Sequence, residues 1–210
     1  MPTTAGVFGC FLCRPEREWT WHESANFRAI LGLGPIGAGY TLIASRDHLP
    51  SMLDLDSGLA QQLDVFTSEV RRELEKRWGP SVIAEHGRVA ACVADAVRGH
   101  EPHCLHAHRL VFPGHSELDL RSVAPRMKVR DFSTMLVARR EFRWTGQYLY
   151  VETPDRRCQL GQIEGPLPRQ FLRAVVAMQQ GRPDLADWRR APRRGEVDAA
   201  MRILQVSQAA

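Results

Sequence analysis

Apolar residues in the first half of the chain recur at spacings of three and four, the period of an amphipathic helix. The positions that form this stripe are Leu59, Leu63, Phe66, Val70, Leu74 and Trp78. Asp56 and Ser57 offer an N-cap before the stripe, and Gly79 with Pro80 ends the pattern after it. The spacing therefore predicts one long helix between this cap and this stop.

Short apolar runs bounded by turn residues predict strands on both sides of the helix. We expect these strands at residues 39–45, 81–85, 104–112, 133–139 and 147–152. Two more helices are expected, at residues 167–180 and at about 196–206. This order predicts an α+β fold with a mainly antiparallel sheet packed by helices. We divide the chain into a core, residues 1–115, and a C-terminal α/β extension, residues 116–210.

The composition is that of a globular chain. Of its 210 residues, 44% are hydrophobic and 25% are charged, which argues against disorder and against fibrous repeats. The most apolar stretch, residues 30–44, is broken by glycines and by Pro35, so no membrane span is expected. The N-terminal residues lack the features of an export signal, and we expect a soluble, cytoplasmic protein.

The net charge of +4 comes from the last part of the chain, where residues 167–210 contain eight arginines and four acidic residues. Trp188, Arg189 and Arg190 in this region could form a contact with nucleic acid. No recognised nucleic-acid motif accompanies them, so a solvated loop or an oligomer contact is the favoured interpretation.

Cysteine and histidine residues indicate a metal site. Five cysteines are an odd set, which argues against a disulfide framework. Cys10 and Cys13 have the spacing that lets two sulfurs reach one tetrahedral zinc. Alternation along the expected strand places His106 and His108 on one face, and His48 follows an earlier strand. A set of two cysteines and two histidines would complete a structural zinc site.

The order of these motifs resembles the histidine triad superfamily, over about residues 8 to 115. The resemblance rests on the Cys10-x-x-Cys13 pair, the segment from Gly34 to His48, the long helix, Glu85-His86-Gly87, and His106-Ala-His108 running on to Pro113. It implies a HIT-like fold for the core. From the zinc-containing members it also implies a structural Zn²⁺ held by Cys10, Cys13, His48 and His106.

The middle histidine of the triad is the nucleophile of this superfamily. Two registers fit this chain, one with Cys104, His106 and His108, the other with His106, His108 and Leu110. The second is favoured because family members reach a proline three residues after the third position, as Pro113 does here. The resemblance thus implies His108 as the catalytic residue, with Leu110 where a side-chain donor is usual.

The activity that the resemblance implies is hydrolysis at the α-phosphate of a nucleotide-like substrate through a covalent nucleotidyl-histidine. Dinucleoside polyphosphates and nucleotide phosphoramidates lie within this range. A nucleotidyltransferase or phosphorylase with the same intermediate, and a nucleotide-binding module without turnover, stay open as alternatives. A homodimer is a further expectation. We also expect Tyr150, Gln170 and Arg173 of the extension to bind the substrate, with Arg173 able to meet its phosphate.

The remaining cysteines and nearby histidines have simpler expected roles. Cys92 and Cys158 are expected to pack in the interior. His100 and His103 are expected to be exposed, with His103 as an alternative zinc ligand.

Overall fold

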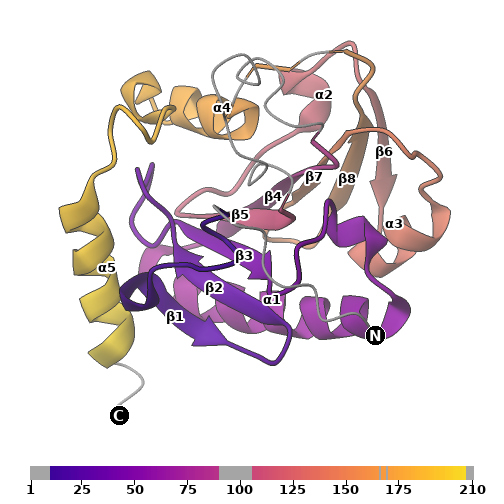
Figure 1. Ribbon diagram of the computed structural model, residues 1–210. Coiled ribbons are helices and arrows are strands. Elements are labelled where there is room, and N and C mark those ends of the chain that lie inside the picture. The colour runs from indigo at the N-terminus through magenta and orange to yellow at the C-terminus, as the bar shows by residue number, and fades with distance from the viewer. Residues whose placement is uncertain (1–9, 90–105, 166, 169, 207–210) are drawn as a thin grey trace.

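The computed structural model describes residues 10–89, 106–165, 167–168 and 170–206, and these contain one sheet of eight strands (Figure 1). All neighbouring strands are antiparallel. The strands are β1 (Thr20–Glu23), β2 (Phe27–Leu31), β3 (Thr41–Ser45), β4 (Ser81–Gly87), β5 (His108–Pro113), β6 (Lys128–Phe132), β7 (Tyr148–Glu152) and β8 (Cys158–Gln162). Across the sheet their order is β1-β2-β3-β5-β4-β7-β8-β6, which places β5 in the interior. The α+β class with an antiparallel sheet is confirmed.

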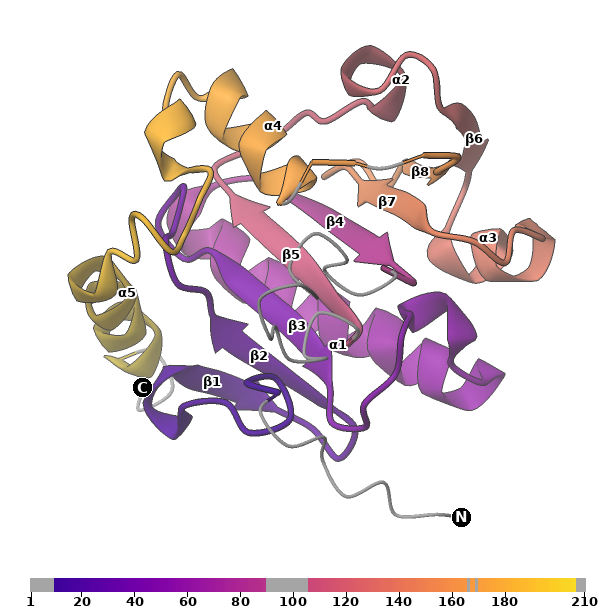
Figure 2. The same ribbon diagram turned by 45° about the horizontal axis from the view of Figure 1, so that its top comes forward.

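The helix α1 (Ser57–Trp78) runs along one face of the sheet, against β2, β4 and β5 (Figure 2). Asp56 caps its first turn by accepting a hydrogen bond from the Leu59 amide at 2.8 Å. The helix ends at Gly79, whose φ of 84° favours glycine. Its buried side contains the apolar stripe Leu63, Phe66, Val70 and Leu74, so this stripe seals one face of the sheet.

The opposite face carries the N-terminal segment from Cys10, the short turn η1 (Arg17–Trp19), α4 (Phe171–Gln179) and the turn η5 (Pro183–Leu185) (Figure 2). The helix α5 (Arg194–Val206) packs against β1 and β2, and the Trp19 indole donates to Asp198 at 3.1 Å. The turn η2 (Met52–Asp54) precedes α1, and α2 (Leu120–Val123) lies against β8. No helix in the described part of the chain has the length and apolar character needed to cross a membrane.

The prediction of a strand at residues 133–139 is wrong, because most of these residues belong to the helix α3 (Met135–Glu141). The Thr134 hydroxyl caps this helix by accepting a hydrogen bond from the Val137 amide at 3.2 Å. Met135, Ala138 and Phe142 are buried at spacings of three and four. A helix buries all three on one side, whereas a strand would place Met135 and Ala138 on opposite faces.

Four strands, β1, β2, β6 and β8, have no counterpart among the sequence predictions. Of these, β6 lies at the sheet edge and is mostly exposed, so its sequence lacks the apolar run that marks a buried strand. The strands after residue 115 continue the same sheet, with Tyr150 of β7 opposite Glu85 of β4. The division of the chain at residue 115 is untested and stays a prediction.

Candidate metal centre and adjoining cavity

Cys10, Cys13, His48 and His106 lie together, with their ligand atoms all within 4.8 Å of one another. The Cys10 sulfur is 3.3 Å from His106 Nδ1, and the Cys13 sulfur is 3.2 Å from His48 Nδ1. Bonds of about 2.3 Å to sulfur and about 2.0 Å to nitrogen in a tetrahedron place such atoms roughly 3.5 Å apart. The four side chains therefore have the spacing and the chemistry of a tetrahedral metal site.

Local backbone structure sets these ligands in place. A tight turn joins the two cysteines, with the Cys13 amide donating to the Cys10 carbonyl at 3.2 Å. The Arg28 guanidinium from β2 holds the same turn through the Cys13 carbonyl at 3.1 Å. His106 stands just before β5, where the Ala107 amide donates to the Leu49 carbonyl at 2.5 Å. The cluster thus ties the N-terminal segment to the sheet.

The protonation states also suit a metal. His106 Nε2 lies 2.8 Å from the Ser45 carbonyl, which can only accept, so Nε2 carries the proton and Nδ1 faces the cysteines. Burial lowers the pKa of His106 to about 4, which keeps the ring neutral. Burial raises the pKa of the Cys10 thiol to about 11, and a bound cation is what would stabilise its thiolate there.

His108 is the first residue of β5, two positions after His106 and opposite Ala44 of β3. Its Nδ1 lies 2.8 Å from the His106 carbonyl. Because that carbonyl accepts, Nδ1 carries the proton and Nε2 carries the lone pair. Burial lowers the pKa of His108, so the neutral ring is favoured. The side chain is half-buried and lines a cavity.

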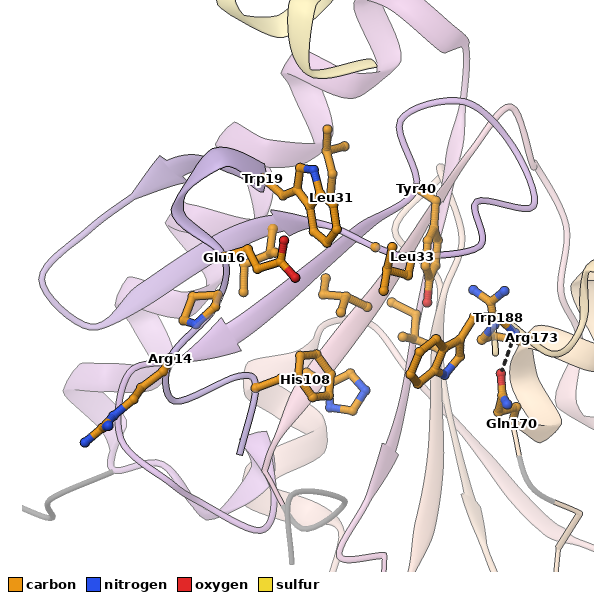
Figure 3. A pocket seen from close by; sticks show the side chains of 16 residues that line it. Arg14, Glu16, Trp19, Leu31, Leu33, Tyr40, His108, Gln170, Arg173 and Trp188 are labelled. Atoms are coloured by element: carbon orange, nitrogen blue, oxygen red, sulfur yellow. Dashed lines mark hydrogen bonds between the residues drawn. The ribbon is translucent and has the colours of Figure 1, made fainter. Parts of the chain in front are cut away.

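This cavity has a volume of about 430 Å³, and Figure 3 shows the side chains that line it. It lies on the sheet face opposite α1, because Arg109, the strand neighbour of His108, points the other way and bonds Thr67 of α1. Aromatic side chains from three parts of the chain line it: Phe11, Trp19, Tyr40 and Trp188. Aliphatic walls come from Ile30, Leu31, Leu33, Leu42 and Leu110. A cavity of this size with mostly apolar walls and a few polar groups is typical of small-molecule sites.

The structure brings two of the three expected substrate-binding residues to this cavity. Gln170 and Arg173 both line it, and Leu110 occupies the wall two residues after His108. Tyr150 does not line the cavity, which corrects the expectation that it binds the substrate. It is fully buried, lies opposite Glu85, and donates from its hydroxyl to Glu152 at 2.5 Å. The alternation of strand residues points Tyr150 toward α1, away from His108.

His86 is a polar neighbour of His108 that the sequence interpretation assigned no role. Ala84 of β4 lies opposite Leu110, and the same register continued by two residues places His86 opposite His108. Its Nε2 is 3.2 Å from Gln147 Oε1. Burial lowers the pKa of His86, and the neighbouring His108 lowers it further.

The aromatic residues of the cavity wall were missed by the sequence interpretation. Trp188 was expected in a solvated loop or an oligomer contact, yet it lines the cavity. Trp188 itself is half-buried, and its neighbours Arg189 and Arg190 are exposed. The one sequence signal for its position in the wall was an aromatic residue within an arginine-rich stretch. Cys158 is buried as expected. The expectations for Cys92, His100, His103 and Cys104 lie outside the described residues.

No protein-family model matches the chain, and no curated protein matches it either. Among solved structures, a hypothetical protein from Leishmania major is similar over 54% of this chain and 76% of that one. The two are 16% identical, with a TM-score of 0.40. A similarity at this level carries no argument about fold family or function.

Proposed function

We propose that the chain is a zinc-containing relative of the histidine triad superfamily, and that His108 attacks phosphorus in a nucleotide-like substrate. The observation that carries this proposal is the state of His108. Its Nδ1 proton is fixed on a backbone carbonyl at 2.8 Å, and its ring lines an apolar cavity beside the Cys2His2 cluster. A fixed, neutral imidazole with one free lone pair is the arrangement that nucleophilic catalysis needs.

The metal in this proposal is a structural Zn²⁺ held by Cys10, Cys13, His48 and His106, the donor set found in closed zinc sites. Protein atoms would supply all four ligands of such an ion, so it would contribute stability and orientation. His106 is a ligand, and its carbonyl accepts the Nδ1 proton of His108. Fixing His106 therefore also fixes the direction of the His108 lone pair.

The reaction follows from that lone pair. His108 Nε2 forms a bond to the α-phosphorus while the bond from phosphorus to the leaving group breaks, and the leaving group takes the electron pair and a proton from solvent. Water then attacks the same phosphorus and loses a proton. The bond between phosphorus and nitrogen breaks, and its electron pair returns to Nε2. The net result is hydrolysis to a monophosphate.

The cavity supports a substrate with a flat apolar part. Trp19, Tyr40 and Trp188 offer aromatic surface against which a nucleobase can pack.

Leu110 also favours a second candidate, a nucleotide-binding module without turnover. Leucine has no hydrogen-bond donor at the triad position where one is usual, and losing one such donor typically costs about 100- to 1000-fold in rate. Transfer to a second acceptor, the homodimer and the cytoplasmic location stay predictions.

The experiment is intact mass spectrometry of the metal-loaded protein after brief incubation with dinucleoside polyphosphates and nucleotide phosphoramidates. We expect an added nucleotidyl mass on the wild type and none on His108→Ala. His115→Ala is the matched control, because His115 bonds Gln179 outside the cavity, and it should keep the adduct.

The products decide among the candidates. Monophosphate release without an added acceptor supports hydrolysis, and release that needs phosphate or a sugar phosphate supports transfer. If the protein binds substrates of the panel but forms neither adduct nor product with any of them, the proposal of an enzyme is rejected and that of a non-catalytic nucleotide-binding module is supported.

A further inference from the structure

Phe11 lies between two of the candidate metal ligands and also lines the cavity. It belongs to the turn that runs from Cys10 to Cys13, and 47% of the residue is exposed. The sulfurs of both cysteines belong to the metal cluster, whereas Leu12 is fully buried in the core. Neighbouring residues of one short turn therefore serve the metal site, the core and the cavity.

The chain that follows the turn continues the same side of the cavity. Arg14, Pro15 and Glu16 line the cavity, and so does Trp19 of η1. The Trp19 amide donates to the Glu16 carbonyl at 3.2 Å, which holds this part of the segment in shape. One side of the cavity is thus built from a single segment that starts at the metal turn.

Other aromatic residues of the wall have anchors outside the metal turn. The Trp19 indole donates to Asp198 of α5 at 3.1 Å. The Tyr40 ring stacks on Phe112 of β5, with 5.2 Å between the ring centroids. In Figure 3, Trp19 and Tyr40 lie on different sides of the cavity. Phe11 differs from them because its position follows from the conformation of a turn whose two ends are metal ligands.

The conformation of this turn is fixed in part without a metal. The amides of Cys13 and Arg14 both donate to the Cys10 carbonyl, at 3.2 and 3.3 Å. The Arg28 guanidinium donates to the Cys13 carbonyl at 3.1 Å. Coordination of both sulfurs would also fix the side chains on either side of Phe11, and a wall that is ordered before the ligand arrives lowers the entropy cost of binding. We therefore expect a graded effect of the metal on the cavity, not the loss of the whole cavity.

We propose that Phe11 is a ligand-binding residue that packs against the flat base of a nucleoside, and that metal occupancy at Cys10 and Cys13 sets the affinity for this base. Aromatic rings pack well against flat ring systems, and the cavity wall offers several of them. The coupling is reciprocal, so the bound base must raise the affinity for the metal by the same factor. The inference rests on the metal site of the proposed function but needs no reaction at His108.

The test titrates adenosine, guanosine, cytidine and uridine into zinc-loaded and zinc-depleted protein by isothermal titration calorimetry. None of these probes carries a phosphorus atom that His108 could attack. We expect at least one nucleoside to bind the zinc-loaded protein about five- to fiftyfold more tightly than the zinc-depleted protein. Competition with a chelator should show the same factor in zinc affinity, with and without that nucleoside. Equal affinity in both forms, or no binding of any nucleoside to the zinc-loaded protein, overturns the proposal.

Phe11→Ala tests the residue itself. The zinc-loaded variant should keep one zinc ion per chain and bind the nucleoside about tenfold more weakly, because it loses aromatic contact area. The zinc-dependent factor in nucleoside affinity should shrink as well, and Phe11→Tyr should restore both. Met178→Ala is the matched control, because Met178 is also an exposed apolar residue, at 64%, but does not line the cavity. Unchanged affinity in Phe11→Ala, or an equal loss in the control, overturns the proposal.

Thermal melting checks that the zinc-depleted protein is folded. If it is not, the comparison of Phe11→Ala with the wild type, both loaded with zinc, decides. The inference and the proposed reaction fail separately. Zinc-dependent nucleoside binding without an adduct on His108 keeps the inference and rejects the catalytic proposal, whereas an adduct without this dependence does the reverse.

Discussion

Buried polar side chains on the two faces of the central strands have different kinds of partner. On the α1 face, Arg71 pairs with Glu152 at 2.7 Å, and Arg109 lies 3.8 Å from Glu85. Glu85 also accepts hydrogen bonds from the Met52 amide at 2.9 Å and from a tyrosine hydroxyl. On the opposite face, His108 and Arg173 donate to backbone carbonyls and line a cavity.

The two faces therefore differ in which groups hold their buried polar side chains. Opposite charges paired inside the protein hold α1 to the sheet, although several of their atoms, among them Arg109 Nε and Glu85 Oε2, have no hydrogen-bond partner among the described residues. The polar groups of the other face, His108 and Arg173, are held by backbone carbonyls and form no ion pair with a described carboxylate. Neighbouring residues of one strand, Arg109 and His108, thus have different surroundings, because they point to opposite faces.

The largest expected effect comes from removing the metal, because the cluster anchors the cavity face. Cys13→Ser should lose a stoichiometric metal ion and several kcal/mol of stability, since metal binding is coupled to folding. The measurement is elemental analysis with thermal melting. Cys158→Ser is the control, because Cys158 is buried far along the chain, beside Tyr150, and should keep the metal. Retention of metal by Cys13→Ser would remove the site as described.

The next effect concerns the paired face. Glu152→Ala should cost about 3 to 5 kcal/mol of unfolding free energy, because it leaves buried Arg71 with Glu75, at 3.9 Å, as its one carboxylate partner in the described part of the chain. Urea unfolding measures this loss. Glu164→Ala breaks an exposed pair with Lys128 and should cost less than about 1 kcal/mol. Similar losses in the two variants would show that the buried pair has no special weight.

A smaller effect should follow from adding a donor to the cavity face. Leu110 lines the cavity near His108, and Leu110→His would place an imidazole at the third triad position. If the proposed reaction occurs, turnover should rise about tenfold or more, in part reversing the loss expected from a missing donor. Steady-state kinetics measures the change. An unchanged or lower rate in a folded variant would show that the leaving group lies elsewhere.

The smallest effect concerns the partner of a metal ligand. The Ser45 hydroxyl lies 3.3 Å from His106 Nε2, but the Ser45 carbonyl is closer, at 2.8 Å. Ser45→Ala keeps the carbonyl, so metal affinity should fall less than the tenfold or more typical of lost outer partners. Competition with a chelator measures this affinity. A larger loss would show that the hydroxyl is the main acceptor for His106.

The hydrophobic pattern of the sequence predicted elements correctly where burial alone determines the secondary structure. The apolar stripe of α1 lies on its buried side, and the class of the fold is confirmed. The pattern failed at α3, where Met135-Leu-Val-Ala138 is as apolar as a strand and the Thr134 cap decides in favour of a helix. It also failed at the exposed edge strand β6, whose pairing with β8 depends on residues about thirty positions away.

The cysteine spacing together with the family resemblance predicted Cys10, Cys13, His48 and His106 from the sequence, and the structure brings these four together as a cluster that could hold a metal ion. The sequence also predicted a strand at His108, although that strand, β5, begins at His108 and leaves His106 before it. Only the tertiary structure decided that Trp188 and Arg173 close the same cavity, and that Tyr150 does not. The physical reason is that a side chain's direction depends on strand pairing and on packing between distant segments, which local patterns do not record.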